Sequence, residues 1–521
     1  MSQSIGIPTG GSAFQSGLGI LKKYASFIGP GIMVSVAYMD PGNYSTAVSS
    51  GADYEYSLLI IIFLSNLFAV VLQCLCVKLG TVTGLDLAEM CRLNLPWWLN
   101  LFLYVCAEIA IIATDLAEVV GTAIALEILF GIPLVFGVLI TVLDVLIILF
   151  AYHKDGNLRQ TRTFEIMVSI LVAATCVCFV VELFKCDFEP GSFGKIVEGF
   201  LPVNMEVFTE SRALFLSCGI VGSTVMPHSL YLGSSLVQSR LKDYDIRNGN
   251  VSINSDGEVE NSGDEQSDAL ALSQNKFLAI SDGSSLARKY RPSYSAIKYC
   301  LNYSYIELIL SLFIIAVFVN ASILIVAGST LYGKPDADDA DLLSIYEMLS
   351  HYISPAAGLI FALSMLFSGQ SAGIVCTMAG QIISEGFINW SFKPWIRRII
   401  TRVLAIIPVL IVIIILGREG VATIMNSSQV VLSFILPVVS APLIWFTANR
   451  KYMAVNDINS EAPDEQTALL SDEGDGANGS TQKLVFFENG RWLNVAAFST
   501  WLIITFLNIY LVYLFSIGIE V

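Results

Sequence analysis

Charged residues are scarce in this 521-residue chain. Asp, Glu, Lys and Arg make up 14% of it, and hydrophobic residues make up 55%, whereas a soluble domain has about 25% charged residues. Histidine is rarer still, with three residues. No His-Glu-x-x-His pair and no Gly-x-Ser-x-Gly elbow occurs in an apolar segment, so we expect no intramembrane enzyme. A chain this poor in charge is predicted to lie mainly in lipid.

Disulfide frameworks and zinc-binding spacings are also missing. Most of the ten cysteines lie in apolar segments, where they behave as small hydrophobic residues. The first 24 residues are polar and lack the apolar core of a cleavable signal peptide. Much of the net charge of −16 falls in residues 241–291 and 451–487. We interpret it as solvated loop charge and expect no nucleic-acid partner.

Long apolar runs recur along the whole chain. Several approach the ~20 residues with which a helix crosses a bilayer, and none alternates like a membrane β-strand. We therefore predict an all-α polytopic membrane protein with about 11 transmembrane helices. The predicted spans are residues 27–48, 57–79, 98–129, 133–152, 164–184, 211–239, 297–328, 355–387, 395–416, 423–447 and 493–517.

Basic residues in the short loops predict the orientation. All basic loops fall on one side if the N-terminus is cytosolic. The predicted organisation is a disordered cytosolic N-terminus (1–24), helices 1–6 (25–240), a disordered cytosolic insert (241–291), helices 7–10 (292–450), a cytosolic polar loop (451–487) and helix 11 (488–521).

The polar loop carries one short sorting pattern. Glu465 stands four residues before the pair Leu469-Leu470. Cytosolic sorting adaptors bind acidic dileucine signals of this kind, although such short patterns also arise by chance. The pattern makes a vacuolar or endosomal membrane our expected location, in preference to the plasma membrane.

The first span contains a predicted helix break. Asp40, Pro41, Gly42 and Asn43 stand in the middle of residues 28–48. Proline lacks the N–H of a helix and clashes one turn back, and glycine is costly within a helix. A carboxylate at mid-membrane costs at least ~2.5–3.5 kcal/mol unless it meets water, a partner or a cation. We expect a polar site here rather than a kinked packing helix.

The sixth span repeats this pattern with Met226, Pro227 and His228. Two interrupted helices at corresponding positions are typical of inverted-repeat transporters, whose sites lie near the midplane. Spans one to five and six to ten would be the two halves. This correspondence is the sequence evidence for the symmetry.

The groups at the two breaks indicate the cargo. Asp40 offers a carboxylate, Asn43 an amide oxygen and Met226 a thioether. Oxygen ligands alone suit Ca²⁺ or Mg²⁺, whereas sulfur favours softer metals such as Fe²⁺ and Mn²⁺. Two alternatives keep the same fold: an ion-coupled amino-acid transporter, whose substrate carboxylate Asp40 would repel, and a Mg²⁺ transporter, which would be expected to lack the sulfur.

Three carboxylates in the third span predict a proton or ion path. Glu108, Asp115 and Glu118 share an arc of roughly 80° on one helix face. Arg397 and Arg398, at the start of the ninth span, either pair with this stripe or anchor their helix at the interface. Histidine ordinarily titrates near neutrality, so His228 is either a gate between Asp40 and the stripe or a polar contact between helices.

Together these motifs resemble the NRAMP family of proton-coupled divalent metal transporters. The resemblance rests on residues 40–43 and 226–228 and on the runs 114–126 and 369–387. Fungal, vacuolar iron-exporter-like members are more similar than the plasma-membrane manganese importers. The resemblance implies a LeuT-type 5+5 inverted repeat. It also implies alternating-access transport of Fe²⁺ or Mn²⁺ with protons, from the lumen of a vacuole or endosome to the cytosol. No cofactor is expected beyond the transported ions.

The resemblance also implies roles for single residues. The metal ligands would be Asp40, Asn43, Met226, the carbonyls of Ala37 and Ser223 and, in some states, Gln429. The proton network would comprise Glu108, Asp115, Glu118, His228 and a ninth-span arginine. Ser223 departs from the family, in which alanine is usual here. A carbonyl ligand survives this change, and the hydroxyl is a further oxygen.

Overall fold

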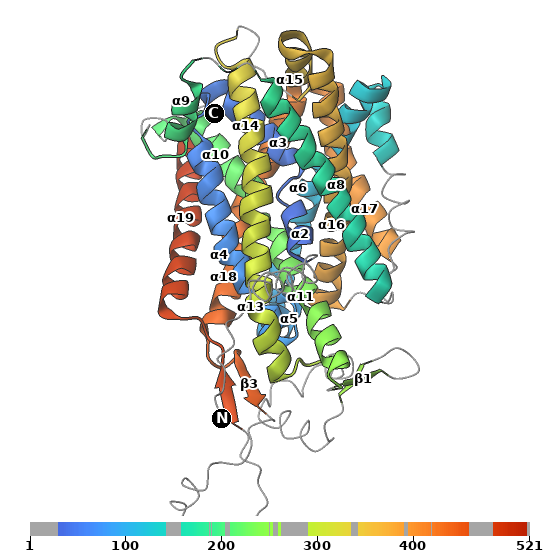
Figure 1. The fold of residues 1–521 in the computed structure, drawn as a ribbon, viewed down its shortest axis with the longest axis vertical. Coiled ribbons are helices and arrows are strands. Elements are labelled where there is room, and N and C mark those ends of the chain that lie inside the picture. Colours follow the sequence, from blue (N-terminus) through green and yellow to red (C-terminus); the bar gives the residue numbers. More distant parts are fainter. Residues whose placement is uncertain are drawn as a thin grey trace, which may run out of the picture.

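A computed structural model describes most of the transmembrane region. The described residues are 30–141, 158–186, 188, 190–203, 209–249, 251–253, 259–261, 290–334, 342–389, 394–417, 419–457 and 483–517. They form a bundle of long helices with two small strand pairs at one end (Figure 1). We call this the hairpin end, and the opposite end, toward which α3 lies, the α3 end.

The helices follow the predicted spans closely. The first half contains α2 (Pro30–Val36), α3 (Pro41–Tyr54), α4 (Leu59–Thr83), α5 (Leu87–Asn94), α6 (Trp97–Phe130), α8 (Leu158–Lys185) and α9 (Ser192–Gly199). The rest contains α10 (Ser211–Thr224), α11 (Pro227–Arg247), α13 (Tyr294–Ser311), the π-helix η2 (Leu312–Ala316), α14 (Val317–Leu331), α15 (Leu342–Met348), the π-helix η3 (Leu349–Ile353), α16 (Pro355–Ile388), α17 (Pro394–Leu416), α18 (Glu419–Ala448) and α19 (Arg491–Ser516).

Nine segments of the described chain are long and apolar enough to cross a membrane. The first predicted span is not among them because it is divided into α2 and α3. Of the fourth, only residues 133–141 are described, as helix from residue 134 onward. The buried fraction divides these nine segments into central and peripheral helices. The most apolar part of α10–α11 is 94% buried and that of α6 is 83% buried, whereas those of α8, α17 and α19 are 28% buried. The protein is therefore an integral multi-pass membrane protein with broken and polar helices at its centre.

Helix contacts follow the predicted two-fold pseudo-symmetry. The exchange of the two halves converts the packing of α3 on α14 into that of α11 on α4, and both contacts are present. It likewise converts the packing of α8 on α16 into that of α18 on α6, and these are also present. Helices one and six are both broken. The architecture is the LeuT-type 5+5 inverted repeat, as predicted.

Two polar stretches contain more structure than the sequence predicts. Helix α11 continues to Arg247, seven residues into the insert predicted to be disordered, and Arg247 pairs with Asp243 one turn earlier at 2.7 Å. Strand β1 (Val251–Ile253) pairs antiparallel with β2 (Val259–Asn261). In the polar loop, β3 (Ala454–Asp457) pairs with β4 (Lys483–Phe486). The sorting pattern at residues 465–470 and the N-terminus (1–24) lie outside the described residues.

Candidate functional site

The first break places Asp40 at the beginning of the half-helix α3. Pro41 is the first residue of that helix, and Asp40 precedes it with extended backbone (φ −67°, ψ 150°). Asp40 is fully buried, and neither carboxylate oxygen accepts a hydrogen bond from the described residues. A carboxyl group in such a setting either binds a proton and is neutral or, when ionised, requires a cation.

Met226 holds the equivalent position at the second break. Helix α10 ends at Thr224, and the fully buried Met226 precedes Pro227, the first residue of α11. In a continuous helix, the carbonyl of residue i accepts from the N–H of residue i+4. For Ala37 and Ser223 that residue is proline, Pro41 and Pro227 respectively, which has no N–H. The two prolines therefore free the two carbonyls that the resemblance implies as ligands.

Contacts on either side bring the two breaks together. Toward the α3 end, Thr46 Oγ1 lies 3.4 Å from Ser223 Oγ. Toward the hairpin end, the Tyr38 hydroxyl lies 3.4 Å from Ser229 Oγ, and Gln73 Nε2 donates to both hydroxyl oxygens. Asp40 follows Tyr38 by two residues, and Met226 precedes Ser229 by three. Both breaks therefore lie between these two contacts.

Gln429 of α18 closes this site from a third side. A Cβ added to Gly42 would lie 2.1 Å from Gln429 Nε2, and one added to Gly222 would lie 1.9 Å from the Gln429 carbonyl. Gln429 is fully buried, and its Oε1 lacks a hydrogen-bond partner, as does Asn43 Nδ2. Rotating the Asn43 amide exchanges its nitrogen with its oxygen. The site thus collects carboxylate and amide groups that a cation can bind.

The Ser223 hydroxyl is engaged by its own helix. It donates to the carbonyl of Ile220 at 3.1 Å and faces Thr46. Two neighbouring carbonyls of the first break are also engaged, because that of Tyr38 accepts from Asn320 at 3.1 Å and that of Met39 accepts from Ser368. Ala37 lies in the same turn and is 2% exposed. In this conformation, the hydrogen of the Ser223 hydroxyl is therefore used within α10, and its carbonyl has no helical donor because residue 227 is proline.

The carboxylate stripe of α6 meets two arginines of α17. Arg397 Nη2 donates to both carboxylate oxygens of Glu108, at 2.7 and 2.8 Å. Arg402 Nη1 lies 3.1 Å from Glu118 Oε2 and 3.7 Å from Asp115 Oδ1. The sequence predicts that Arg397 or Arg398 pairs with the stripe but misses Arg402. The side chain of Arg398 lies outside the described residues.

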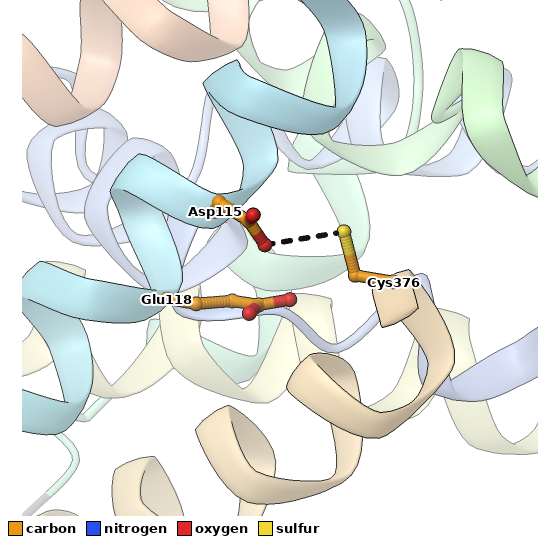
Figure 2. A group of neighbouring side chains, drawn as sticks. All are labelled: Asp115, Glu118 and Cys376. Carbon is orange, nitrogen blue, oxygen red and sulfur yellow. Dashed lines mark hydrogen bonds between the residues drawn. The ribbon is translucent and has the colours of Figure 1, made fainter. Parts of the chain in front are cut away.

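Asp115, Glu118 and Cys376 form a compact buried group (Figure 2). Their ligand atoms lie within 4.8 Å of one another, a distance that would allow a metal ion. The Cys376 thiol donates to Asp115 Oδ1 at 3.4 Å. Arg402 already places a positive charge against both carboxylates. We therefore interpret the group as an ion-pair network rather than a second metal site.

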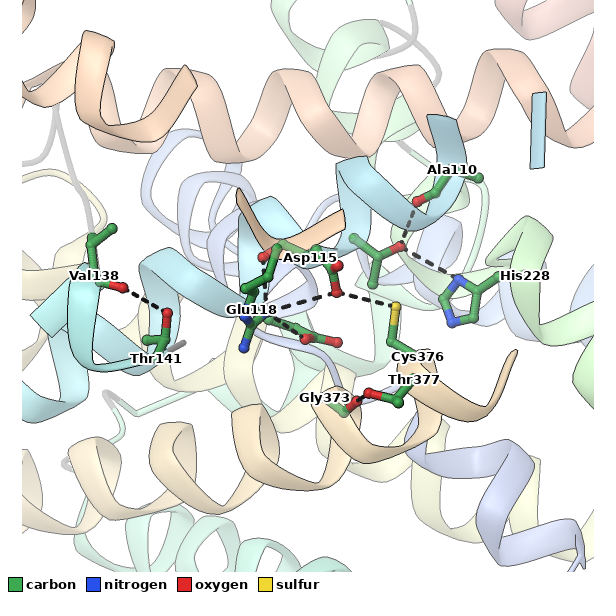
Figure 3. A network of polar contacts seen from close by, with 11 residues as sticks. Ala110, Asp115, Glu118, Val138, Thr141, His228, Gly373, Cys376 and Thr377 are labelled. Atoms are coloured by element: carbon green, nitrogen blue, oxygen red, sulfur yellow. Dashed lines mark hydrogen bonds and ion pairs between the residues drawn. The ribbon is translucent and has the colours of Figure 1, made fainter. Parts of the chain in front are cut away.

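His228 connects the breaks with this network (Figure 3). Its Nδ1 lies 3.4 Å from Thr114 Oγ1, and Thr114 directly precedes Asp115. Asp40 in turn lies within electrostatic range of Glu118 and Asp115. One continuous region therefore holds the charged groups of α6, the imidazole of α11 and the carboxylate of the first break.

This fold and site define a class: a membrane transporter with a binding site between two broken helices. The chain belongs to the Nramp family, described as natural resistance-associated macrophage protein-like, whose model matches residues 31–460. The family resemblance predicted from the sequence is confirmed.

Three relatives illustrate the family. The chain is 56% identical over 506 residues to the iron transporter SMF3 of Saccharomyces cerevisiae, with 96% of this chain and 98% of that protein covered. It is 47% identical over 507 residues to the manganese transporter SMF1 of the same yeast, with 94% and 85% covered. A crystal structure of the Eremococcus coleocola manganese transporter has 29% identity and a TM-score of 0.69, with 97% and 88% covered. These relatives are transporters rather than enzymes, and metals are their cargo rather than cofactors.

Proposed function

We propose that this protein carries Fe²⁺ or Mn²⁺ across a membrane by alternating access, coupled to proton movement. The observation that carries the proposal is Asp40, which is buried at a helix break with neither oxygen hydrogen-bonded. The relatives named as iron and manganese transporters support the same cargo. A divalent cation bound between the breaks would compensate the Asp40 charge.

Helix polarity favours a cation over an amino acid. The half-helices α2 and α10 end at the breaks with free carbonyls, which suit a cation. Helices α3 and α11 begin there, and their N-termini would attract a substrate carboxylate. Asp40 occupies the α3 terminus and repels such an anion. The thioether of Met226 then favours Fe²⁺ and Mn²⁺ over Ca²⁺ and Mg²⁺.

Protons follow a separate route in this proposal. Metal binding requires Asp40 to be deprotonated, so a bound proton must leave. His228 lies beside Thr114, at the edge of the Asp115, Glu118 and Arg402 network. The proton moves from Asp40 toward this network through His228, and Glu108 with Arg397 continues the stripe toward the hairpin end. Rocking of one helix bundle against the other then exposes the site to the second compartment.

The direction of transport follows from the predicted orientation. Basic short loops favour a cytosolic hairpin end, which carries β3 and β4, the strands that flank Glu465, Leu469 and Leu470 in the sequence. A sorting adaptor that binds this acidic dileucine pattern would direct the protein to a vacuole or endosome. We infer that the protein there releases metal from the lumen into the cytosol.

Metal binding to purified protein tests the site. Asp40→Asn removes the charge but keeps the shape, and we expect it to abolish the saturable Mn²⁺ binding that isothermal titration detects in the wild type. Asp243→Asn is the matched control, because it makes the same change in a surface ion pair. Undiminished Mn²⁺ binding by Asp40→Asn would place the site elsewhere.

A further inference from the structure

A buried carboxyl group on α8 has no role in the site described above. Glu182 is 1% exposed, and neither of its carboxylate oxygens has a hydrogen-bond partner in the described chain. No arginine, lysine or histidine of the described residues pairs with it. A carboxylate desolvated in this way is strongly disfavoured, whereas the neutral acid is tolerated. The surroundings of Glu182 therefore favour a bound proton.

A second buried polar group lies near Glu182. The hydroxyl of Tyr44, on α3, is fully buried and lies within electrostatic range of Glu182. The ring of Tyr44 packs on Phe179, one turn before Glu182, with centroids 5.5 Å apart. The other titratable neighbour is Cys178 on α8 itself. Helices α16, α14 and α2 also pack against α8, and their described residues bring no charged side chain to Glu182.

Polar side chains continue from Tyr44 to the first break. The Tyr44 hydroxyl lies beside the hydroxyls of Ser364 and Ser368, both fully buried on α16. Ser368 donates to the carbonyl of Met39, the residue before Asp40. Tyr44 itself directly follows Asn43. A column of buried polar groups thus runs from Glu182 to the candidate metal site.

Glu182, at the start of this column, and the Glu108–Arg397 pair of the α6 network lie toward different ends of the helix bundle. Glu182 is in the last turn of α8, whose C-terminal end lies toward the α3 end (Figure 1). Glu108 and Arg397, in contrast, pair near the N-terminal ends of α6 and α17. We propose that Glu182 is a second proton-binding site of the transporter, loaded from the compartment at the α3 end. The reaction is simple protonation of the carboxylate to the acid, with Tyr44 as the neighbouring hydroxyl.

Infrared difference spectroscopy of the full-length protein tests this site. A buried protonated carboxyl absorbs in the carbonyl-stretch region above the amide bands and shifts in D₂O. We expect the wild type to show such a band, Glu182→Gln to lose it, and Tyr44→Phe to shift its frequency. An identical band in Glu182→Gln would overturn the proposal, because the acid would then belong to another residue.

Metal binding is the competing outcome. In an Asp40→Asn background, which removes the main site, added Mn²⁺ should leave the Glu182 band unchanged. Loss of the band on Mn²⁺ addition would show that Glu182 binds metal, which contradicts the proposal.

The contribution of Glu182 to transport rests on the proposed function, whereas its protonation does not. In proteoliposomes, we expect Glu182→Gln to lose part of the dependence of Mn²⁺ uptake on pH at the α3 end, with Mn²⁺ affinity unchanged. If Glu182→Gln kept the full pH dependence of the wild type, the proposed role of Glu182 in transport would be overturned. If uptake by the wild type showed no pH dependence, this would count against proton coupling. The infrared band would still show whether Glu182 is protonated.

Discussion

Asp40 and Met226 have different roles in the site: the first concerns the binding of a cation and the second the selection among cations. An ionised Asp40 without a partner is unfavourable in the membrane interior, so its position explains why a cation binds. Met226 contributes no charge, and its sulfur adds little to the binding of hard ions. It therefore explains which cations bind.

Removal of the sulfur should widen the selectivity. We expect Met226→Ala to keep Mn²⁺ transport, because Asp40, Asn43 and the freed carbonyls remain, and to admit Ca²⁺, which suits oxygen ligands. Met365→Ala is the matched control, since Met365 is equally buried but lies on α16. Uptake of both ions into proteoliposomes, followed with a metal-quenched or a Ca²⁺-sensitive dye, makes the comparison. Equal rejection of Ca²⁺ by wild type and Met226→Ala would refute the selectivity role.

At the scale of single residues, the sequence predicted positions better than partners. Asp40 stands out because a carboxylate beside a proline has a clear cost in an apolar run. Arg402 lay within the apolar run 395–416, and a charged residue there is itself a functional signal. Its pairing with Asp115 and Glu118 depends on how α17 packs against α6, which local sequence does not contain.

Local sequence determines where the first and sixth spans break, whereas close helix packing brings the two breaks together. Pro41 and Pro227 each begin a new helix because they cannot continue the previous one. Gly42 and Gly222 then allow α18 to approach both broken helices at Gln429. The breaks were predictable from sequence, whereas this approach was not.

The two glycines should differ in tolerance. A methyl group at Gly222 would lie 1.9 Å from a backbone carbonyl of α18, whereas one at Gly42 would meet the end of the Gln429 side chain, which can move. We expect Gly222→Ala to lower the unfolding temperature and abolish transport, at an overpacking cost of about 1–3 kcal/mol. Gly42→Ala should stay folded with weakened metal binding. Gly194→Ala is the control, since a Cβ added there would meet no atom of the described residues within 4 Å.

Thermal unfolding in detergent, with metal uptake measured in parallel, makes this comparison. The close approach of α18 would be refuted if Gly222→Ala unfolded and transported like Gly194→Ala.

Helix boundaries show the same limit of prediction. The bounds of α6 and α16 agree with the predicted spans to about one residue, because both helices begin at or directly after a proline and end at a residue with left-handed backbone, Gly131 or Asn389. The short helices α5, α9 and α15 were missed, since each has fewer than nine residues and no spanning signal. Helix α5 is instead fixed by a capping box between Asp86 and Glu89.

The whole molecule supplies the asymmetry that transport requires. Its two halves are related by pseudo-symmetry, yet the charged network lies between α6 and α17 on one side of the breaks. Metal and proton therefore have distinct partners but share Asp40. The sequence predicted the two halves from the corresponding breaks, and the spatial separation of the two routes became visible in the packing.

The most direct test is metal uptake into proteoliposomes with an imposed pH gradient. We predict that Mn²⁺ and Fe²⁺ enter the vesicles and that Ca²⁺ and Mg²⁺ do not. A gradient with the metal side acidic should accelerate uptake, and Asp40→Asn should abolish it. Uptake of Ca²⁺ or Mg²⁺ at rates similar to Mn²⁺, or Mn²⁺ uptake that ignores the pH gradient, would contradict a proton-coupled transition-metal transporter with its site at Asp40 and Met226.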